Sequence, residues 1–131
     1  INPTATIIFT VSPVRHLKDG FIENAQSKAH LIAAIHQVSD KRNRLYYFPS
    51  FEIMMDDLRD YRFYTKDMLH PSEQAVDYIW DKFCSRYMNA NTLALMRRVE
   101  NLEAAKNHLP RFPNSAAHQK HKAFIQKEIA A

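Results

Sequence analysis

Apolar residues in the first half of the chain form two short continuous runs, at residues 5–11 and 45–48, rich in β-branched and aromatic side chains. Runs of this length are typical of strands that are buried on both faces of a parallel sheet. Between them, from Asn24 to about Ser39, apolar positions recur at helical spacing, and Asn24 is the expected N-cap. Strand, helix and strand in this order predict a right-handed βαβ unit with parallel strands.

Four further helices are predicted after the second run, over residues 52–58, 72–88, 92–109 and 116–130. The helix over 72–88 has the clearest pattern, with apolar pairs every four residues, and Thr92 is the expected cap of the next one. We therefore predict an α/β fold. It is a partial three-layer, doubly wound, flavodoxin-like parallel sheet of about two strands, with C-terminal helices.

The length of 131 residues suits one domain, and a hydrophobic content of 46% is enough for a packed core. No apolar run approaches the roughly 20 residues of a membrane helix, so we expect no membrane partner. The chain begins at Ile1 rather than Met, and we expect it to be part of a longer protein whose native N-terminus is not present. The cellular location stays open, with the cytoplasm favoured.

Charge, cysteine and histidine content add little specific chemistry. The net charge of +4 indicates either affinity for nucleic acid or a solvated basic surface, and its spread along the chain favours the second. Cys84 is the only cysteine, which excludes an internal disulfide, and we expect it to be a small buried filler. His108, His118 and His121 lack cysteine or carboxylate partners, so we predict no metal and no cofactor.

The strongest chemical feature is an acid and an imidazole three residues apart, Asp67 and His70, just before the helix over 72–88. A carboxylate close to a histidine holds the ring in one tautomer and stabilises its protonated form, which is the general-base half of a serine-hydrolase triad. Pro71 suits the first turn of a helix and Ser72 is an alternative N-cap. The competing interpretation is that Asp67 caps a turn and His70 is an exposed loop residue.

Polar residues that follow the first strand are candidates to line a ligand crevice. Ser12, Arg15 and His16 lie just past the carboxyl end of the strand, where open α/β sheets bind ligands. The planar fork of Arg15 suits a carboxylate or phosphate ligand, or alternatively an internal pair with Asp19 or Asp60. Both possibilities stay open.

Charged and aromatic residues alternate over residues 59–64, and Arg62 is counted among the site-lining candidates. Such a pattern can grip a nucleic-acid strand by stacking. The favoured interpretation is a packed loop that braces the acid–base turn, with Arg59 and Arg62 paired to Asp56, Asp57 or Asp60.

A set of segments in fixed order resembles a known family, at residues 10–16, 24 with 27–29, 47–53, and 57–64 running into 67–72. The last segment resembles the final block of the SGNH/GDSL hydrolase superfamily, and the whole set is closer to its GSCFA branch. The resemblance implies an SGNH-like fold and a parent protein that is a serine esterase or acyl-ester hydrolase. Its substrate would be a small-molecule or glycan ester, with His70 taking the proton of the nucleophile and Asp67 orienting His70.

The chain departs from that family at the Gly-Ser-Cys-Phe-Ala motif, which it lacks. Its one glycine, Gly20, is followed by Phe21, and Cys84 is preceded by Phe83. The chain therefore looks like the C-terminal part of a GSCFA protein without the nucleophile and oxyanion-hole blocks, and we expect it to be inactive alone. Residues 1–91 would belong to the hydrolase domain, and residues 92–131 would be a helical extension that packs on the same domain.

Two alternatives complete the sequence-based picture. The chain is alternatively a non-catalytic binding module that uses its basic helices and the arginine–aromatic loop, although nucleic acid is not the favoured ligand. Because two strands leave a sheet edge unpaired, we expect a homodimer through that edge, unless the helices from residue 92 onward cover it.

Overall fold

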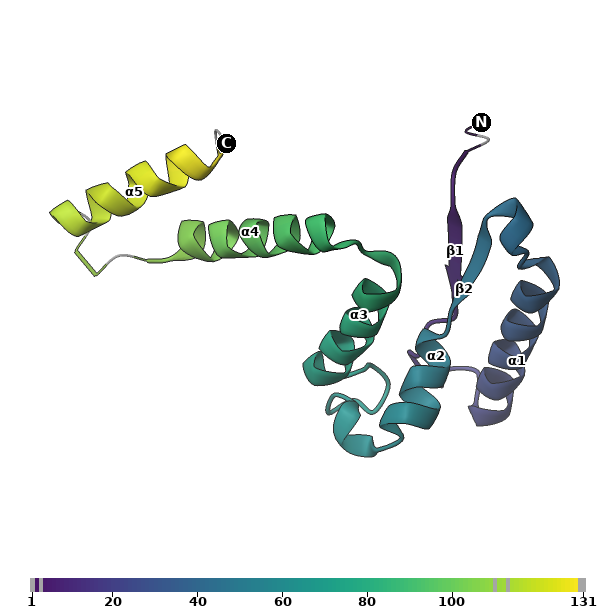
Figure 1. Ribbon diagram of the computed structural model, residues 1–131. Coiled ribbons are helices and arrows are strands. Elements are labelled where there is room, and N and C mark those ends of the chain that lie inside the picture. Colours follow the sequence, from purple (N-terminus) through teal and green to yellow (C-terminus); the bar gives the residue numbers. More distant parts are fainter. Residues whose placement is uncertain (1, 3, 110, 113, 130–131) are drawn as a thin grey trace. The chain divides into compact units, whose positions relative to one another are not determined.

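The computed structural model describes residues 2, 4–109, 111–112 and 114–129 of the chain. The chain divides into two compact units, Ile1–Arg86 and Tyr87–Ala131. The first unit contains the sheet and the second contains the last two helices (Figure 1). Each unit is described by itself.

The sheet of the first unit consists of β1 (Ile7–Thr10) and β2 (Leu45–Phe48), which pair in parallel with Ile7 opposite Leu45 and Thr10 opposite Phe48. The helix α1 (Phe21–Val38) connects the two strands. The predicted βαβ unit is confirmed, and β1 is shorter than the apolar run over 5–11.

Each face of this sheet is covered by a different helix. On one face the ring of Tyr47 lies 4.9 Å from that of His36 of α1. On the other face Phe48 packs edge-on against Phe83 of α3 (Glu73–Tyr87), with ring centroids 5.1 Å apart. Side chains of adjacent strand residues point to opposite faces of a sheet. The consecutive Tyr47 and Phe48 therefore contact helices on opposite faces. This arrangement of helix, sheet and helix is the predicted α/β layering (Figure 1).

The start of α1 differs from the sequence-based expectation. The helix begins at Phe21 with Gly20 at the N-cap, rather than at Asn24. Gly20 has φ of +110°, a conformation that only glycine adopts readily, and this allows the chain to enter the helix early. Asn24 lies inside the helix, where its side-chain oxygen accepts a hydrogen bond from the backbone N–H of His16 at 2.8 Å.

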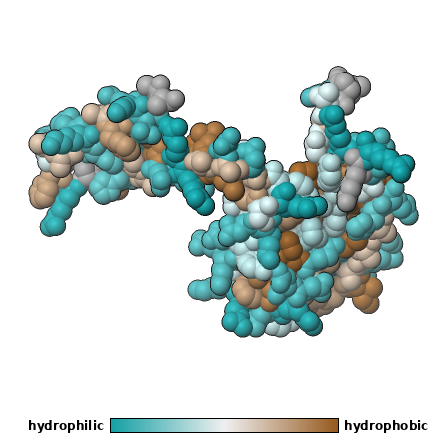
Figure 2. Space-filling model, viewed as in Figure 1, coloured by the Kyte–Doolittle hydropathy of each residue, from teal (hydrophilic) through white to brown (hydrophobic). Residues whose placement is uncertain are grey.

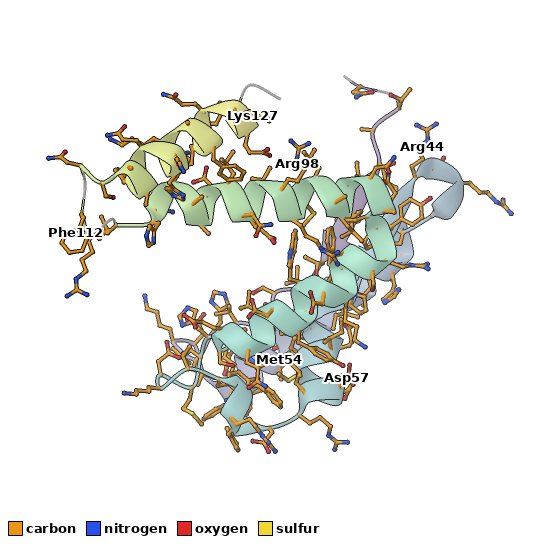
Figure 3. The ribbon with its side chains drawn as sticks, turned by 60° about the vertical axis from the view of Figure 1, so that its left-hand side comes forward. Arg44, Met54, Asp57, Arg98, Phe112 and Lys127 are labelled. Atoms are coloured by element: carbon orange, nitrogen blue, oxygen red, sulfur yellow. The ribbon has the colours of Figure 1, made fainter. Side chains whose placement is uncertain are left out.

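Short helical segments lead into and out of β2, namely η1 (Lys41–Asn43), α2 (Ser50–Glu52), the π-helical η2 (Ile53–Leu58) and the 3₁₀ turn η3 (Tyr61–Phe63). The helix expected over 52–58 is thus present, with π geometry. Its Met54 is buried together with Tyr64 and Ala75, the last of which belongs to α3 (Figure 3). This small cluster attaches the segment after β2 to the start of α3.

The second unit consists of α4 (Ala90–Asn107) and α5 (Ala116–Ile129). Asn89, not Thr92, caps α4, because the Asn89 side chain accepts a hydrogen bond from the backbone N–H of Thr92 at 2.9 Å. Arg98 of α4 pairs with Glu128 of α5 at 3.3 Å (Figure 3). None of the described residues of these two helices is buried.

Hydrophobic surface interrupts the hydrophilic surface of both units (Figure 2). In the first unit it includes Val76 and Trp80 of α3, which are 53% and 45% exposed. The described residues contain no helix that is long and apolar enough to cross a membrane.

The outer edge of β1 is open in the described part of the chain, where β1 pairs with β2 alone. Ile7 donates its backbone N–H to the Arg44 carbonyl at 3.0 Å, toward β2. Backbone groups alternate in direction along a parallel strand, so those of Ile8 and Thr10 point away from β2. They form a row of unpaired donors and acceptors to which another strand can add.

We therefore expect the chain to self-associate through this edge, with a molar mass in light scattering above that of the monomer. Ile8→Pro removes an outward N–H and should return the mass toward the monomer value with the fold intact. Phe9→Pro is the matched control, because it removes an N–H that points toward β2 and should unfold the sheet. A strictly monomeric wild-type chain at high concentration would contradict this expectation.

Candidate active site

The segment between η3 and α3 folds into a closed turn that carries the acid and the imidazole. Tyr64 and Pro71 form an antiparallel bridge at its base. Inside the bridge Thr65 donates its N–H to the His70 carbonyl at 2.8 Å, and Met68 donates its N–H to the Thr65 carbonyl at 2.9 Å. His70 therefore lies beside the bridge at the base of the turn, shortly before α3 begins at Glu73.

The carboxylate of Asp67 organises this turn from within. Its Oδ1 accepts hydrogen bonds from the Thr65 hydroxyl at 2.6 Å, the Leu69 N–H at 2.8 Å and the His70 N–H at 3.1 Å. These donors, first among them the Thr65 hydroxyl, hold the pKa of Asp67 far below its ordinary value. Met68, at the tip, has φ of +61°, a left-handed conformation that stores strain in a non-glycine residue.

The second carboxylate oxygen of Asp67 binds the imidazole directly. Oδ2 of Asp67 lies 2.6 Å from Nδ1 of His70. Because an ionised carboxylate only accepts hydrogen bonds, the proton of the neutral ring must be on Nδ1. Nε2 then carries the lone pair, and no described residue forms a hydrogen bond with it. The geometry leaves His70 able to accept a proton at Nε2, and Asp67 both caps the turn and orients the ring.

His70 lines an apolar groove, defined here as the cavity of about 610 Å³ between the sheet and α3. The sheet contributes Ile8, Thr10 and Phe48, and α3 contributes Trp80. The groove thus begins where the two strands end at their carboxyl termini. Ligands of open α/β sheets bind at this edge.

Arg15, from the loop after β1, fixes the acid–base turn against the sheet. Its backbone N–H donates to the Leu69 carbonyl at 3.1 Å and its guanidinium donates to the Met68 carbonyl at 3.2 Å. The guanidinium also lies 4.0 Å from the ring centroid of Tyr64, a cation–π contact. Asp60, one of the carboxylates considered as its partner, pairs instead with Arg62.

Ser12 and the buried Lys28 hold the start of the same loop. The Ser12 hydroxyl accepts the N–H of Val14 at 3.2 Å, and the Ser12 carbonyl accepts a hydrogen bond from Nζ of Lys28 at 2.6 Å. Lys28 is 5% exposed, and burial lowers its pKa. Sequence reasoning missed this role, although Lys28 occupies an apolar-face position of α1 between Ala25 and Ile32.

The other serine near a strand end, Ser50, is also committed to the structure. Its hydroxyl donates to the Val11 carbonyl at 2.8 Å. A hydroxyl has one proton, so the 2.6 Å contact between Ser50 and Thr10 must be a hydrogen bond that Thr10 donates. In neither serine does the described geometry direct a hydroxyl proton to His70.

Two other predicted residues are not joined to the pair by any described contact. The guanidinium of Arg62 binds Asp60 at 3.1 Å, as the packed-loop interpretation predicts. His16 is exposed, and its backbone N–H is bound to Asn24. Asp57, also considered as an arginine partner, accepts a hydrogen bond from the Tyr78 hydroxyl at 2.7 Å.

Within the described residues, no group of three or more His, Cys, Asp or Glu side chains could hold a metal ion. Cys84 is buried and free, as expected of a small filler. In the second unit Nε2 of His121 lies 2.9 Å from the Ala105 carbonyl, and the ring also neighbours those of His108 and His118.

These features define an α/β protein with an acid–imidazole pair beside an apolar groove at the strand ends. Residues 1–83, more than half of the chain, match the GSCFA family, and the chain belongs to that family. No curated protein and no solved structure matches the chain.

Thr65→Val should raise the pKa of Asp67 toward its ordinary value of 3.8, because it removes the strongest donor to the carboxylate. Because the pKa of Asp67 is lower in the folded than in the unfolded chain, its ionisation stabilises the fold at pH values above the unfolded pKa of about 4. This stabilisation is lost as the pH falls from there through the folded pKa. The variant should lose less stability than wild type on acidification below about pH 4. Carboxyl ¹³C titration and urea unfolding at several pH values measure both effects. Thr65→Ser, which keeps the hydroxyl, should titrate like wild type, and an unchanged Asp67 pKa in Thr65→Val would contradict the assignment.

Arg15→Lys should lower the free energy of unfolding by about 1 kcal/mol, because an ammonium cannot stack flat on Tyr64 while donating to the Met68 carbonyl. Urea unfolding measures the change. Arg42→Lys, on the exposed η1, is the control and should leave stability unchanged. Equal stability of both variants would show that Arg15 does not fix the turn.

Proposed function

We propose that this chain supplies the acid–base half of an ester-hydrolysing site, in which His70 is the general base and Asp67 its orienting acid. The observation that carries the proposal is the 2.6 Å contact between Asp67 Oδ2 and His70 Nδ1, which leaves Nε2 free to take a proton beside the groove. GSCFA membership and the α/β layering are consistent with it.

The chemistry follows from the tautomer. A nucleophilic hydroxyl attacks the ester carbonyl as Nε2 of His70 takes its proton, and the imidazolium that forms is stabilised by the Asp67 carboxylate. Nε2 then returns the proton to the leaving alkoxide, which departs as an alcohol. Water repeats the two steps on the acyl-enzyme and releases the acid.

The nucleophile and the oxyanion donors come, in this proposal, from residues outside these 131. Two observations support this part: the proton of the Ser50 hydroxyl is donated to the Val11 carbonyl, and no described hydrogen bond joins the Ser12 hydroxyl to His70. The site opens to solvent, since the side chains of His70 and Asp67 are 59% and 45% exposed. A small-molecule or glycan ester is the proposed substrate, and a second copy bound at the edge of β1 is the proposed protein partner.

No structural observation favours the non-catalytic binding module in the same way. This alternative would use the basic helices together with the arginine–aromatic loop. In that loop Arg62 pairs with Asp60, and the ring of Tyr64 contacts the guanidinium of Arg15, so these two side chains have partners within the chain. The loop therefore supports the acid–base turn in the proposed function.

The test is ester hydrolysis by the gene product that contains this chain together with the residues encoded upstream of Ile1. In that protein His70→Ala should lower kcat/KM for nitrophenyl acetate by at least about 10²-fold, the usual contribution of a general base. Asp67→Asn should also lower it, because the amide no longer fixes the Nδ1–H tautomer.

His30→Ala, on the exposed surface of α1, is the matched histidine control and should leave the rate unchanged. The 131-residue chain alone should show no hydrolysis above background. If the 131-residue chain hydrolyses the ester and loses this activity on His70→Ala, the proposal that the nucleophile lies outside these residues is overturned. Full activity of His70→Ala in the longer protein would overturn the proposal itself.

A further inference from the structure

The groove beside His70 has two apolar walls. One is the face of the sheet that carries Ile8 and Phe48, and the other is the α3 face that carries Val76 and Trp80. The indole of Trp80 stacks nearly parallel on the ring of Phe83, at 11° with centroids 5.5 Å apart. The two walls are therefore built from flat and branched side chains with few polar atoms between them.

Polar groups in the groove gather near the strand ends. They are the imidazole of His70 and the hydroxyls of Thr10 and Ser50, and the indole N–H of Trp80 is one further polar group, on the α3 wall. The two hydroxyls are already used, since Thr10 donates to Ser50 and Ser50 donates to the Val11 carbonyl. Among the described side chains of the groove, Nε2 of His70 at the strand ends and the indole N–H of Trp80 on the α3 wall form no hydrogen bond with another described residue.

We propose that the groove binds the acyl chain of the ester, with the carbonyl near His70 and the hydrocarbon along Val76 and Trp80. This inference rests on the proposed function and names its substrate class, esters of fatty acids. Each methylene that leaves water for such a surface should tighten binding by about fourfold. A groove whose walls are mostly apolar fits a hydrocarbon chain better than a sugar ring with its hydroxyl groups.

The size of the groove favours a small apolar ligand over a second copy of the chain. A volume of about 610 Å³ lies within the range of roughly 300–1,000 Å³ typical of small-molecule sites. A stable protein interface buries roughly 1,200 Å² or more in total, and pairing at β1 would use its backbone edge rather than this face. Self-association and acyl binding therefore occupy different surfaces.

The chain contains a single tryptophan, Trp80, so its emission reports on the groove directly. Titration of the 131-residue chain with butanoate, hexanoate and octanoate below their micellar concentrations should shift that emission to shorter wavelength. The apparent Kd should fall by about fourfold per methylene along the series.

Val76→Asn should weaken octanoate binding by at least about threefold, because it removes apolar contact from the groove wall. Val38→Asn is the matched control: Val38 is equally exposed, at 53%, but lies on α1 outside the groove. Its Kd should equal that of wild type, and thermal unfolding of both variants checks that they fold.

A Kd that does not depend on chain length, or that changes equally in both variants, overturns the acyl groove and leaves the proposed hydrolysis standing. An emission shift that follows protein concentration instead of octanoate also overturns it, in favour of a second copy. If octanoate binds as expected but hydrolysis does not depend on His70, the proposed function is overturned instead. The groove would then bind fatty acids without their being part of a substrate.

Discussion

The carboxylate of Asp67 is the group on which the whole candidate site depends. Its Oδ1 takes three donors from the turn that contains it, and its Oδ2 takes the imidazole of His70. An exposed ion pair alone contributes little to stability, because water competes for both partners. Here the ring is fixed because the same carboxylate is already fixed by the backbone. One acidic side chain thus shapes the turn, stays ionised and selects the tautomer.

The sheet places this turn through contacts that involve few residues. Arg15 binds the carbonyls of Met68 and Leu69 and stacks on Tyr64, while Lys28 holds the first carbonyl of the Arg15 loop. Both cations are directed at backbone carbonyls rather than at carboxylates. The position of the imidazole is therefore linked to β1 and α1, and the acid–base turn is carried by the βαβ unit rather than by a free loop.

The end of the family match and the end of the first compact unit lie close together in the sequence. The GSCFA match ends at residue 83, and the first compact unit ends at Arg86. The acid–base pair, the groove and the loop after β1 all lie inside both limits. The second unit has its own helix pair, joined by the Arg98–Glu128 contact, and its helices bury none of their described residues. The proposed chemistry therefore belongs to the first unit.

Local residue order was enough to predict the two parallel strands, the helix between them and the proximity of Asp67 to His70. Those features depend on periodicity of two or 3.6 residues and on groups three positions apart, which sequence displays directly. The helix starts were predicted less well from sequence, because the N-caps of α1 and α4 are Gly20 and Asn89 rather than the expected Asn24 and Thr92.

The role of Lys28, the partners of Arg15 and the groove came only from tertiary structure. Each joins residues far apart in the chain, such as Arg15 and Met68, and sequence spacing carries no information about such contacts. The commitment of the Ser50 proton to Val11 is of the same kind. The sequence alone thus determined which chemical groups are present and the local elements that hold them. Packing of α3 against one face of the sheet, in which the rings of Phe48 and Phe83 meet, created the apolar groove beside His70. Only the tertiary structure decided this, because the residues of the groove come from distant parts of the chain.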